Sequence, residues 1–142
     1  MFDKVLYPTD FSKASIKALK YVRRMKDCGV KEVVLLHVID FEDLLGDVED
    51  IESGKVDIDM QKHFQEAESK LEDMKKEIDG IEIKTMVKVG KPHVNIVETA
   101  EEEKASVIVL GSHGRNPARV MLLGSCSENV LKLSKKPVLV VK

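Results

Sequence analysis

Four short, mainly aliphatic runs without polar alternation constrain the fold of this chain more than any other feature. They occupy residues 5–7, 33–39, 107–110 and 138–141. Runs of this length and composition are typical of strands that are covered on both faces. A fifth segment, residues 81–89, alternates apolar and polar side chains with a two-residue period, which predicts a strand with one solvated face.

Helical patterns fill the stretches between these runs. Two apolar stripes recur at three- and four-residue intervals, one through Ala14, Ala18, Val22 and Met25 and one through Met60, Phe64, Ala67, Leu71, Met74 and Ile78. Gly29 and Gly80 stand where these helices end, Pro92 suits the first turn of a third, and residues 125–128 form a capping box for a fourth. The alternation predicts one α/β domain over residues 1–142, a doubly wound open sheet of five parallel strands.

Two polar stretches are interpreted as surface. Residues 40–59 carry nine acids and one lysine, and we expect a solvated connection there, with a lid or docking loop as the alternative. The run Glu101, Glu102 and Glu103 is interpreted as a solvated helix face.

The final strand, Val138–Val141, lacks the charges that protect an exposed edge. Either another strand of the fold covers this edge, or a second chain does, as in a homodimer.

Composition argues against several classes of partner. The 23 basic and 25 acidic residues leave a net charge of -2, aromatic residues make up 4%, and tryptophan is absent; none of this favours nucleic acid. No apolar run is long enough for a membrane span, and residues 1–5 do not resemble a leader. Cys28 and Cys126 lack the spacing of a zinc site, and we expect a reduced, cytoplasmic protein.

Ligand chemistry is expected directly after the strands, because open α/β sheets bind ligands beyond the carboxyl ends of their strands. The relevant segments are residues 8–12, 38–40 and 111–115, and the last continues to residues 124–127 at the start of a helix. Glycine amides and a helix N-terminus suit phosphate, with Arg115 or Arg119 as counter-charge. Equally, Gly111 and Gly114 would merely turn the chain and Ser125 would merely cap its helix.

Individual residues leave further alternatives open. Asp10 is a ligand contact or a capping partner of Ser12, and Cys126 is a redox-sensitive thiol or, as we prefer, a small apolar residue. His37 is interpreted as a hydrogen-bonded core histidine, and His113 as a surface residue rather than an acid or base. The Walker motif and GxGxxG are both absent, and no catalytic residue is assigned.

The glycine spacing resembles a known motif. The pattern is similar to the nucleotide motif in the ATP-binding branch of the universal stress protein family. It consists of Gly111, two residues, Gly114, nine residues and then Gly124-Ser125. Residues 6–12, 36–38 and 137–141 also resemble that family, so the likeness extends over essentially the whole chain. It implies the strand order 3-2-1-4-5 and a homodimer joined through Val138–Val141.

The resemblance also implies a nucleotide site. Asp10 would contact adenosine, with Pro8 and Thr9 as its wall, and Val38 would present backbone groups to adenine. The phosphate side would comprise Gly111, Gly114, Arg115, Gly124, Ser125, Cys126 and Ser127. ATP, or alternatively AMP or ADP, would bind with Mg²⁺ or Mn²⁺ held by phosphate oxygens and water. The expected function is a nucleotide-dependent sensor or regulator with an unidentified downstream protein; a slow or partner-stimulated ATP hydrolase and a nucleotide-free dimeric scaffold are the alternatives.

Overall fold

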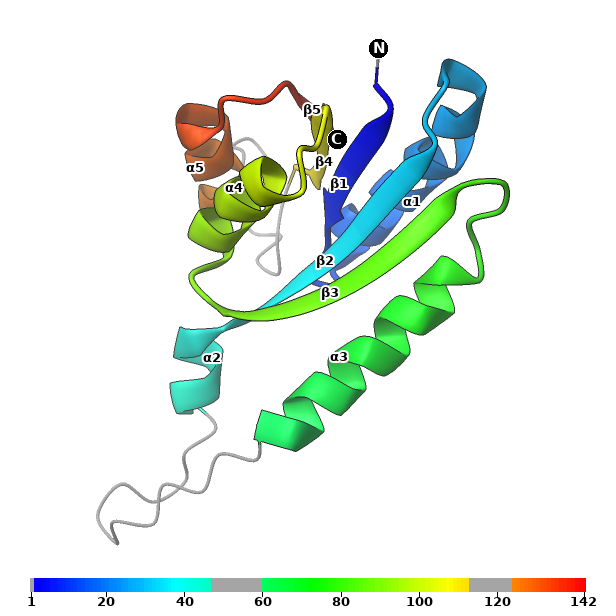
Figure 1. Cartoon of the computed structure of the whole chain (residues 1–142). Coiled ribbons are helices and arrows are strands. Elements are labelled where there is room, and N and C mark those ends of the chain that lie inside the picture. Colours follow the sequence, from blue (N-terminus) through cyan, green and yellow to red (C-terminus); the bar gives the residue numbers. More distant parts are fainter. Residues whose placement is uncertain (1, 47–59, 113–123) are drawn as a thin grey trace, which may run out of the picture.

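Five parallel strands form the sheet in the computed structural model, which describes residues 2–46, 60–112 and 124–142 (Figure 1). The strands are β1 (Lys4–Pro8), β2 (Glu32–Asp40), β3 (Glu82–Gly90), β4 (Val107–Gly111) and β5 (Val138–Val141). The helices are α1 (Lys13–Arg24), the 3₁₀ helix η1 (Met25–Cys28), α2 (Phe41–Gly46), α3 (Met60–Lys75), α4 (Pro92–Glu102) and α5 (Ser125–Leu133). The strand order β3-β2-β1-β4-β5 confirms the predicted order and the doubly wound fold class.

Helices cover both faces of the sheet (Figure 1). On one face, α1 and α3 pack with the strands around Tyr7 and Leu35, and on the other, α4 and α5 pack around Leu6 and Leu36. These four strand residues are fully buried, and each contributes roughly 1.5–3 kcal/mol of hydrophobic stabilisation relative to an exposed position. The continuous apolar runs of β1 and β2 are therefore explained by burial on two sides.

Helix ends follow the predicted signals at some positions and depart from them at others. Ser12 caps α1, its Oγ accepting from the Ser15 amide at 3.2 Å, and Gly29 ends η1 with a left-handed φ of 91°. The predicted capping box at residues 125–128 is wrong. Gly124 is the N-cap residue of α5, and Ser127 Oγ instead donates to the Gly111 carbonyl at 2.9 Å.

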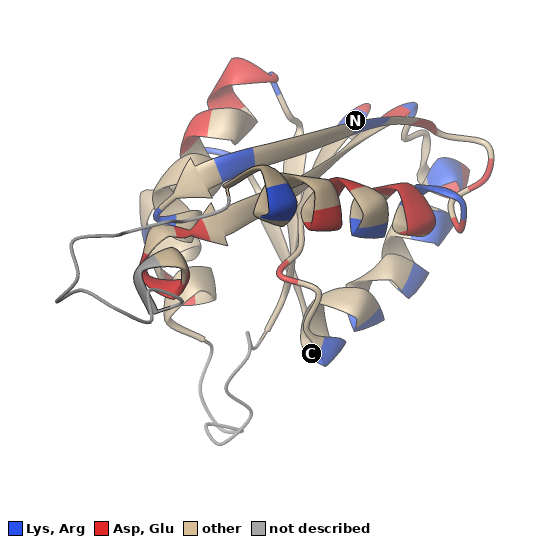
Figure 2. Cartoon of the chain, turned by 90° about the horizontal axis from the view of Figure 1, so that it is seen from below, with Lys and Arg blue, Asp and Glu red and all other residues tan. Residues whose placement is uncertain are grey.

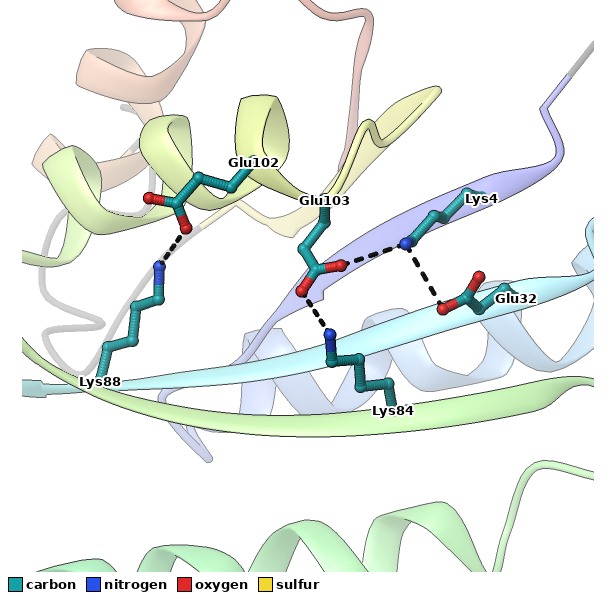
Figure 3. Close-up of polar contacts among 6 residues, drawn as sticks. All are labelled: Lys4, Glu32, Lys84, Lys88, Glu102 and Glu103. Carbon is teal, nitrogen blue, oxygen red and sulfur yellow. Dashed lines mark hydrogen bonds and ion pairs between the residues drawn. The ribbon is translucent and has the colours of Figure 1, made fainter.

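Two segments expected to be solvated have structure. Residues 41–46 form α2 rather than an irregular connection, and residues 47–59 lie outside the described ranges. On β3, Lys84 and Lys88 extend toward the end of α4 (Figure 3). Glu103 accepts from Lys84 Nζ at 2.6 Å and from Lys4 Nζ at 3.1 Å, and Glu102 pairs with Lys88 at 3.0 Å. Glu101 and Glu102 are exposed, as are Glu82 and Lys84 on β3, which agrees with the predicted solvated faces. Glu103 departs from that prediction, because its side chain is only 14% exposed and is held by two lysines.

The net charge of -2 averages over surfaces of different character. Acidic and basic residues alternate along α3 (Figure 2), whereas the sequence of α1 holds five basic residues and no acid. None of the helices in the described ranges has the length and apolar composition that a bilayer crossing requires.

Candidate functional site

A cleft of about 510 Å³ lies at the carboxyl ends of β1, β2 and β4. The helix that follows β1 packs on one face of the sheet, and the helix that follows β4 packs on the other. The crossovers therefore diverge between β1 and β4, and the crevice at such a switch point is where open α/β sheets bind ligands.

The structure brings together nine of the eleven residues predicted for the site. The residues that line this cleft are Pro8, Thr9 and Asp10 after β1, Val38 on β2, Gly111 at the end of β4, and Gly124, Ser125, Cys126 and Ser127 at the start of α5. Gly114 and Arg115, like His113 and Arg119, lie outside the described residues. Four segments that are distant in sequence thus share one concave surface.

Hydrogen bonds fix the wall that β1 contributes. The Thr9 amide donates to the Leu36 carbonyl at 2.8 Å, and Thr9 Oγ1 accepts from Ser15 Oγ at 2.6 Å. Asp10 Oδ1 accepts from the Ser12 amide at 2.9 Å, which supports the residue that caps α1. Asp10 therefore takes part in the start of the helix and lines the cleft as well, so its two proposed roles are compatible.

The neighbouring part of β2 contributes an apolar surface and a buried histidine. Leu36 and Val38 line the cleft, and His37 points to the opposite side of the strand, where its Nδ1 lies 2.7 Å from the Thr9 carbonyl oxygen. His37 is only 6% exposed. Its interpretation as a hydrogen-bonded core histidine is confirmed.

The glycines of the predicted motif differ in what they touch. A Cβ on Gly111 would lie 2.7 Å from the backbone carbonyl of Ala14 and 2.8 Å from the Ser15 amide nitrogen. Gly111 is the last residue of β4, so its small size lets α1 approach the strand rather than turning the chain. Gly124 has φ -60° and ψ 153°, a conformation open to any residue, and it lines the cleft at the first turn of α5.

Sequence reasoning missed seven residues that line the same cleft. They are Ser15, Leu36, Asp40, Asp43, Pro92, Ile96 and Leu110. Asp40 ends β2 and lies in the segment 38–40, where ligand chemistry was expected although Asp40 was not assigned as a contact, whereas Asp43 belongs to the unexpected helix α2. The apolar residues of α4 carried no distinguishing signal, because one side chain of a buried stripe looks like another.

Carboxylates dominate the charge of the cleft. Asp10, Asp40 and Asp43 line it, and its described lining contains no lysine or arginine. Burial, reinforced by the charges of Asp10 and Asp40, raises the pKa of Cys126 to about 11. The thiol is therefore protonated near neutral pH, which favours its interpretation as a small apolar residue over a reactive thiolate. Among the described residues, no group of three or more His, Cys, Asp or Glu side chains is arranged to hold a metal ion.

Fold and cleft together define an open, doubly wound α/β protein with a pocket at its topological switch point. The chain belongs to the universal stress protein family, whose profile matches residues 1–142.

Individual relatives agree with this assignment. The universal stress protein MJ0577 of Methanocaldococcus jannaschii is 43% identical over 159 aligned positions, which cover 100% of this chain and 96% of the relative. The solved structure of MJ0577 has a TM-score of 0.87 to this chain. That of the hypothetical protein PH0823 is 36% identical, has a TM-score of 0.81, and is aligned over 100% of this chain and 96% of that one.

Proposed function

We propose that the cleft binds ATP and that the protein acts as a nucleotide-dependent regulator in the response to stress. The observation that carries the proposal is the convergence of Pro8, Thr9, Asp10, Val38, Gly111 and residues 124–127 on one cleft of about 510 Å³. That volume lies within the range of about 300–1,000 Å³ that is usual for small-molecule sites.

The chemistry of the cleft indicates which end would hold the adenosine and which end the phosphates. Leu36, Val38 and Ile96 offer an apolar surface for a purine ring, and the first turn of α5 offers backbone N–H groups that have no partner within the helix. Carboxylates accept hydrogen bonds from ribose hydroxyls or an exocyclic amino group but repel phosphate. Adenosine therefore belongs beside Asp10 and Asp40, and the phosphates belong at the N-terminus of α5.

A divalent cation would accompany ATP. The described lining has three carboxylates and no basic side chain, so the charge of the triphosphate needs compensation beyond the helix dipole. Mg²⁺ or Mn²⁺ would take its ligands from phosphate oxygens and water, and Arg115 would add counter-charge.

Regulation would follow from differential binding. ATP shifts a conformational equilibrium only if its affinity differs between two states of the protein.

Two solved structures of this fold are nucleotide complexes. One is a universal stress protein with cAMP, with a TM-score of 0.64, and the other is the universal stress protein from Archaeoglobus fulgidus with dAMP, with a TM-score of 0.60. Each is 22% identical to this chain, so the likeness concerns the fold, and the proposal rests on the residues of the cleft.

We further propose a homodimer joined through β5. This strand is at the edge of the described sheet and pairs with β4 alone there. Leu139 on β5 is 42% exposed, and the strand Val138–Val141 carries no charged residue that would protect an exposed edge.

Calorimetric titration with ATP, ADP, AMP and GTP, with and without MgCl₂, tests nucleotide binding. We expect wild type to bind ATP and Gly124→Val to bind it at least tenfold more weakly, because the branched side chain occupies the cleft. The variant should lose about 1 kcal/mol of stability, since valine is a much poorer N-cap residue than glycine, and it should still be folded at the temperature of the titration. Absence of binding by wild type, together with absence of co-purified nucleotide, would leave the scaffold alternative, and phosphate release in a single-turnover assay would favour a hydrolase.

A further inference from the structure

The loop between β1 and α1, residues 9–12, borders two cavities of similar size, whose linings share Asp40 and Asp43. Thr9 and Asp10 line the cleft of about 510 Å³, while Phe11 lines a second cavity of about 500 Å³ together with His37. The second cavity is bordered by α2 and α3, on the other face of the sheet. Successive residues of one short loop therefore face different sides.

Phe11 has an unusual backbone conformation. Its φ is 63°, in the left-handed region, where the Cβ of an L-residue is close to its own backbone. Such a conformation persists only where the surroundings hold it. The Phe11 ring supplies such contacts. Its centroid lies 4.5 Å from the centroid of the His37 ring and 5.0 Å from Nζ of Lys70, which is on α3.

The same contacts reach the wall of the cleft through Thr9. The Phe11 amide donates to Thr9 Oγ1 at 3.0 Å, and His37 Nδ1 lies 2.7 Å from the Thr9 carbonyl oxygen. Asp10 stands between Thr9 and Phe11 in the chain. Its Oδ1 accepts from the Ser12 amide at 2.9 Å, and both of its chain neighbours have contacts on the side of the second cavity.

We propose that Phe11 is a positioning residue of the nucleotide site, whose ring holds the left-handed turn that directs Asp10 into the cleft. This inference rests on the proposed function. The nucleotide site is then coupled to α3 through Lys70, Phe11 and His37, so a change on that helix alters affinity without touching the ligand.

Substitutions at Phe11 separate this role from core packing. Phe11→Ala removes the ring and keeps the cost of the left-handed backbone, so the turn relaxes and ATP binds about tenfold more weakly. Phe11→Gly also removes the ring but adopts the left-handed region freely, so its loss of affinity is smaller. Phe2→Ala is the matched control, because Phe2 packs against the same core cluster near the start of β1, at the opposite end of that strand. It should lower the melting temperature and leave the dissociation constant for ATP unchanged.

Calorimetry on folded protein, with melting temperatures for every variant, gives the result. We expect affinity to decrease in the order wild type, Phe11→Gly, Phe11→Ala, and we expect Phe11→Ala to have little further effect in an Asp10→Asn background. Wild-type affinity in a folded Phe11→Ala, or full additivity with Asp10→Asn, overturns the inference. Should Phe11→Ala fail to fold, an unchanged affinity of Phe11→Gly overturns it equally. Failure of wild type itself to bind ATP overturns the proposed function and this inference with it, and wild type alone reveals that outcome.

Discussion

Gly111→Ala is a single-methyl change whose cost can be worked out from the structure. The added Cβ would lie 2.7 Å from both the carbonyl carbon and the carbonyl oxygen of Ala14 and 2.8 Å from the Ser15 nitrogen. All three are backbone atoms, so no side chain can rotate away to relieve the contact. The first turn of α1 must move away from β4, or β4 must distort.

Overpacking a well-packed interior costs about 1–3 kcal/mol, and the upper end applies because rigid backbone receives the methyl group. We therefore expect Gly111→Ala to lower the free energy of unfolding by about 3 kcal/mol. In a chain of this length that corresponds to a decrease of about 10 °C in melting temperature.

Chemical denaturation and thermal melting of both Gly111→Ala and Gly29→Ala provide the comparison. Gly29 has a φ of 91°, and a Cβ added there would meet nothing within 4 Å, so alanine at this position incurs only the left-handed backbone cost of about 1–2 kcal/mol. We therefore expect Gly111→Ala to lose more free energy of unfolding than Gly29→Ala. A melting temperature of Gly111→Ala within about 2 °C (roughly 0.5 kcal/mol) of wild type would refute the steric reasoning.

Two further predictions concern charge and assembly. The hydrogen bond from Lys84, with that from Lys4, lowers the pKa of Glu103 from its ordinary 4.5. Above that ordinary value, Glu103→Gln should therefore be less stable than wild type by less than about 1 kcal/mol for each of the two ion pairs. Urea denaturation should show this difference in stability disappearing as the pH falls through the lowered pKa. An equal difference at pH 7 and well below the lowered pKa would contradict this account. The carbonyl of Pro137 accepts from Ile108 on β4 and that of Val141 from Ser112 directly after β4, so Val140 directs its backbone N–H to the other edge. If β5 joins the dimer, Val140→Pro should therefore give a folded monomer by light scattering. A dimeric Val140→Pro or a monomeric wild type would exclude that interface.

The fold was predictable because its strongest signals are local and redundant. Apolar runs without alternation located β1, β2, β4 and β5, and helix periodicity located α1 and α3 between them. The short helix α2 was not predicted, since its six residues in an acidic stretch show no apolar period. The role of Glu102 and Glu103 was also missed, because the lysines that pair with them are 14 or more positions away in sequence, and no local pattern reports such a contact.

The site was predictable to the extent that strand ends determine it. The rule that ligands bind beyond the carboxyl ends of parallel strands selects the segments that hold Asp10 and Val38, and the family resemblance selects those two residues within them. The start of α5 follows from its glycine and serines. Asp43 and Ile96 could not be assigned, because helices bring them to the cleft from elements whose orientation the sequence does not specify. The left-handed turn at Phe11 was equally hidden, since phenylalanine gives no local sign of that conformation.

The two motif glycines that line the cleft show why spacing alone leaves a site undecided. Gly111 matches the motif, yet the structure explains its small size by the approach of α1, which also brings Ser15 Oγ within 2.6 Å of Thr9 Oγ1. Gly124 matches equally well, has an unstrained backbone, and leaves the first turn of α5 open toward the cleft. Substitution of the first should therefore appear chiefly as lost stability and substitution of the second chiefly as lost affinity. One motif contains two physical requirements, and only the atoms around each glycine distinguish them.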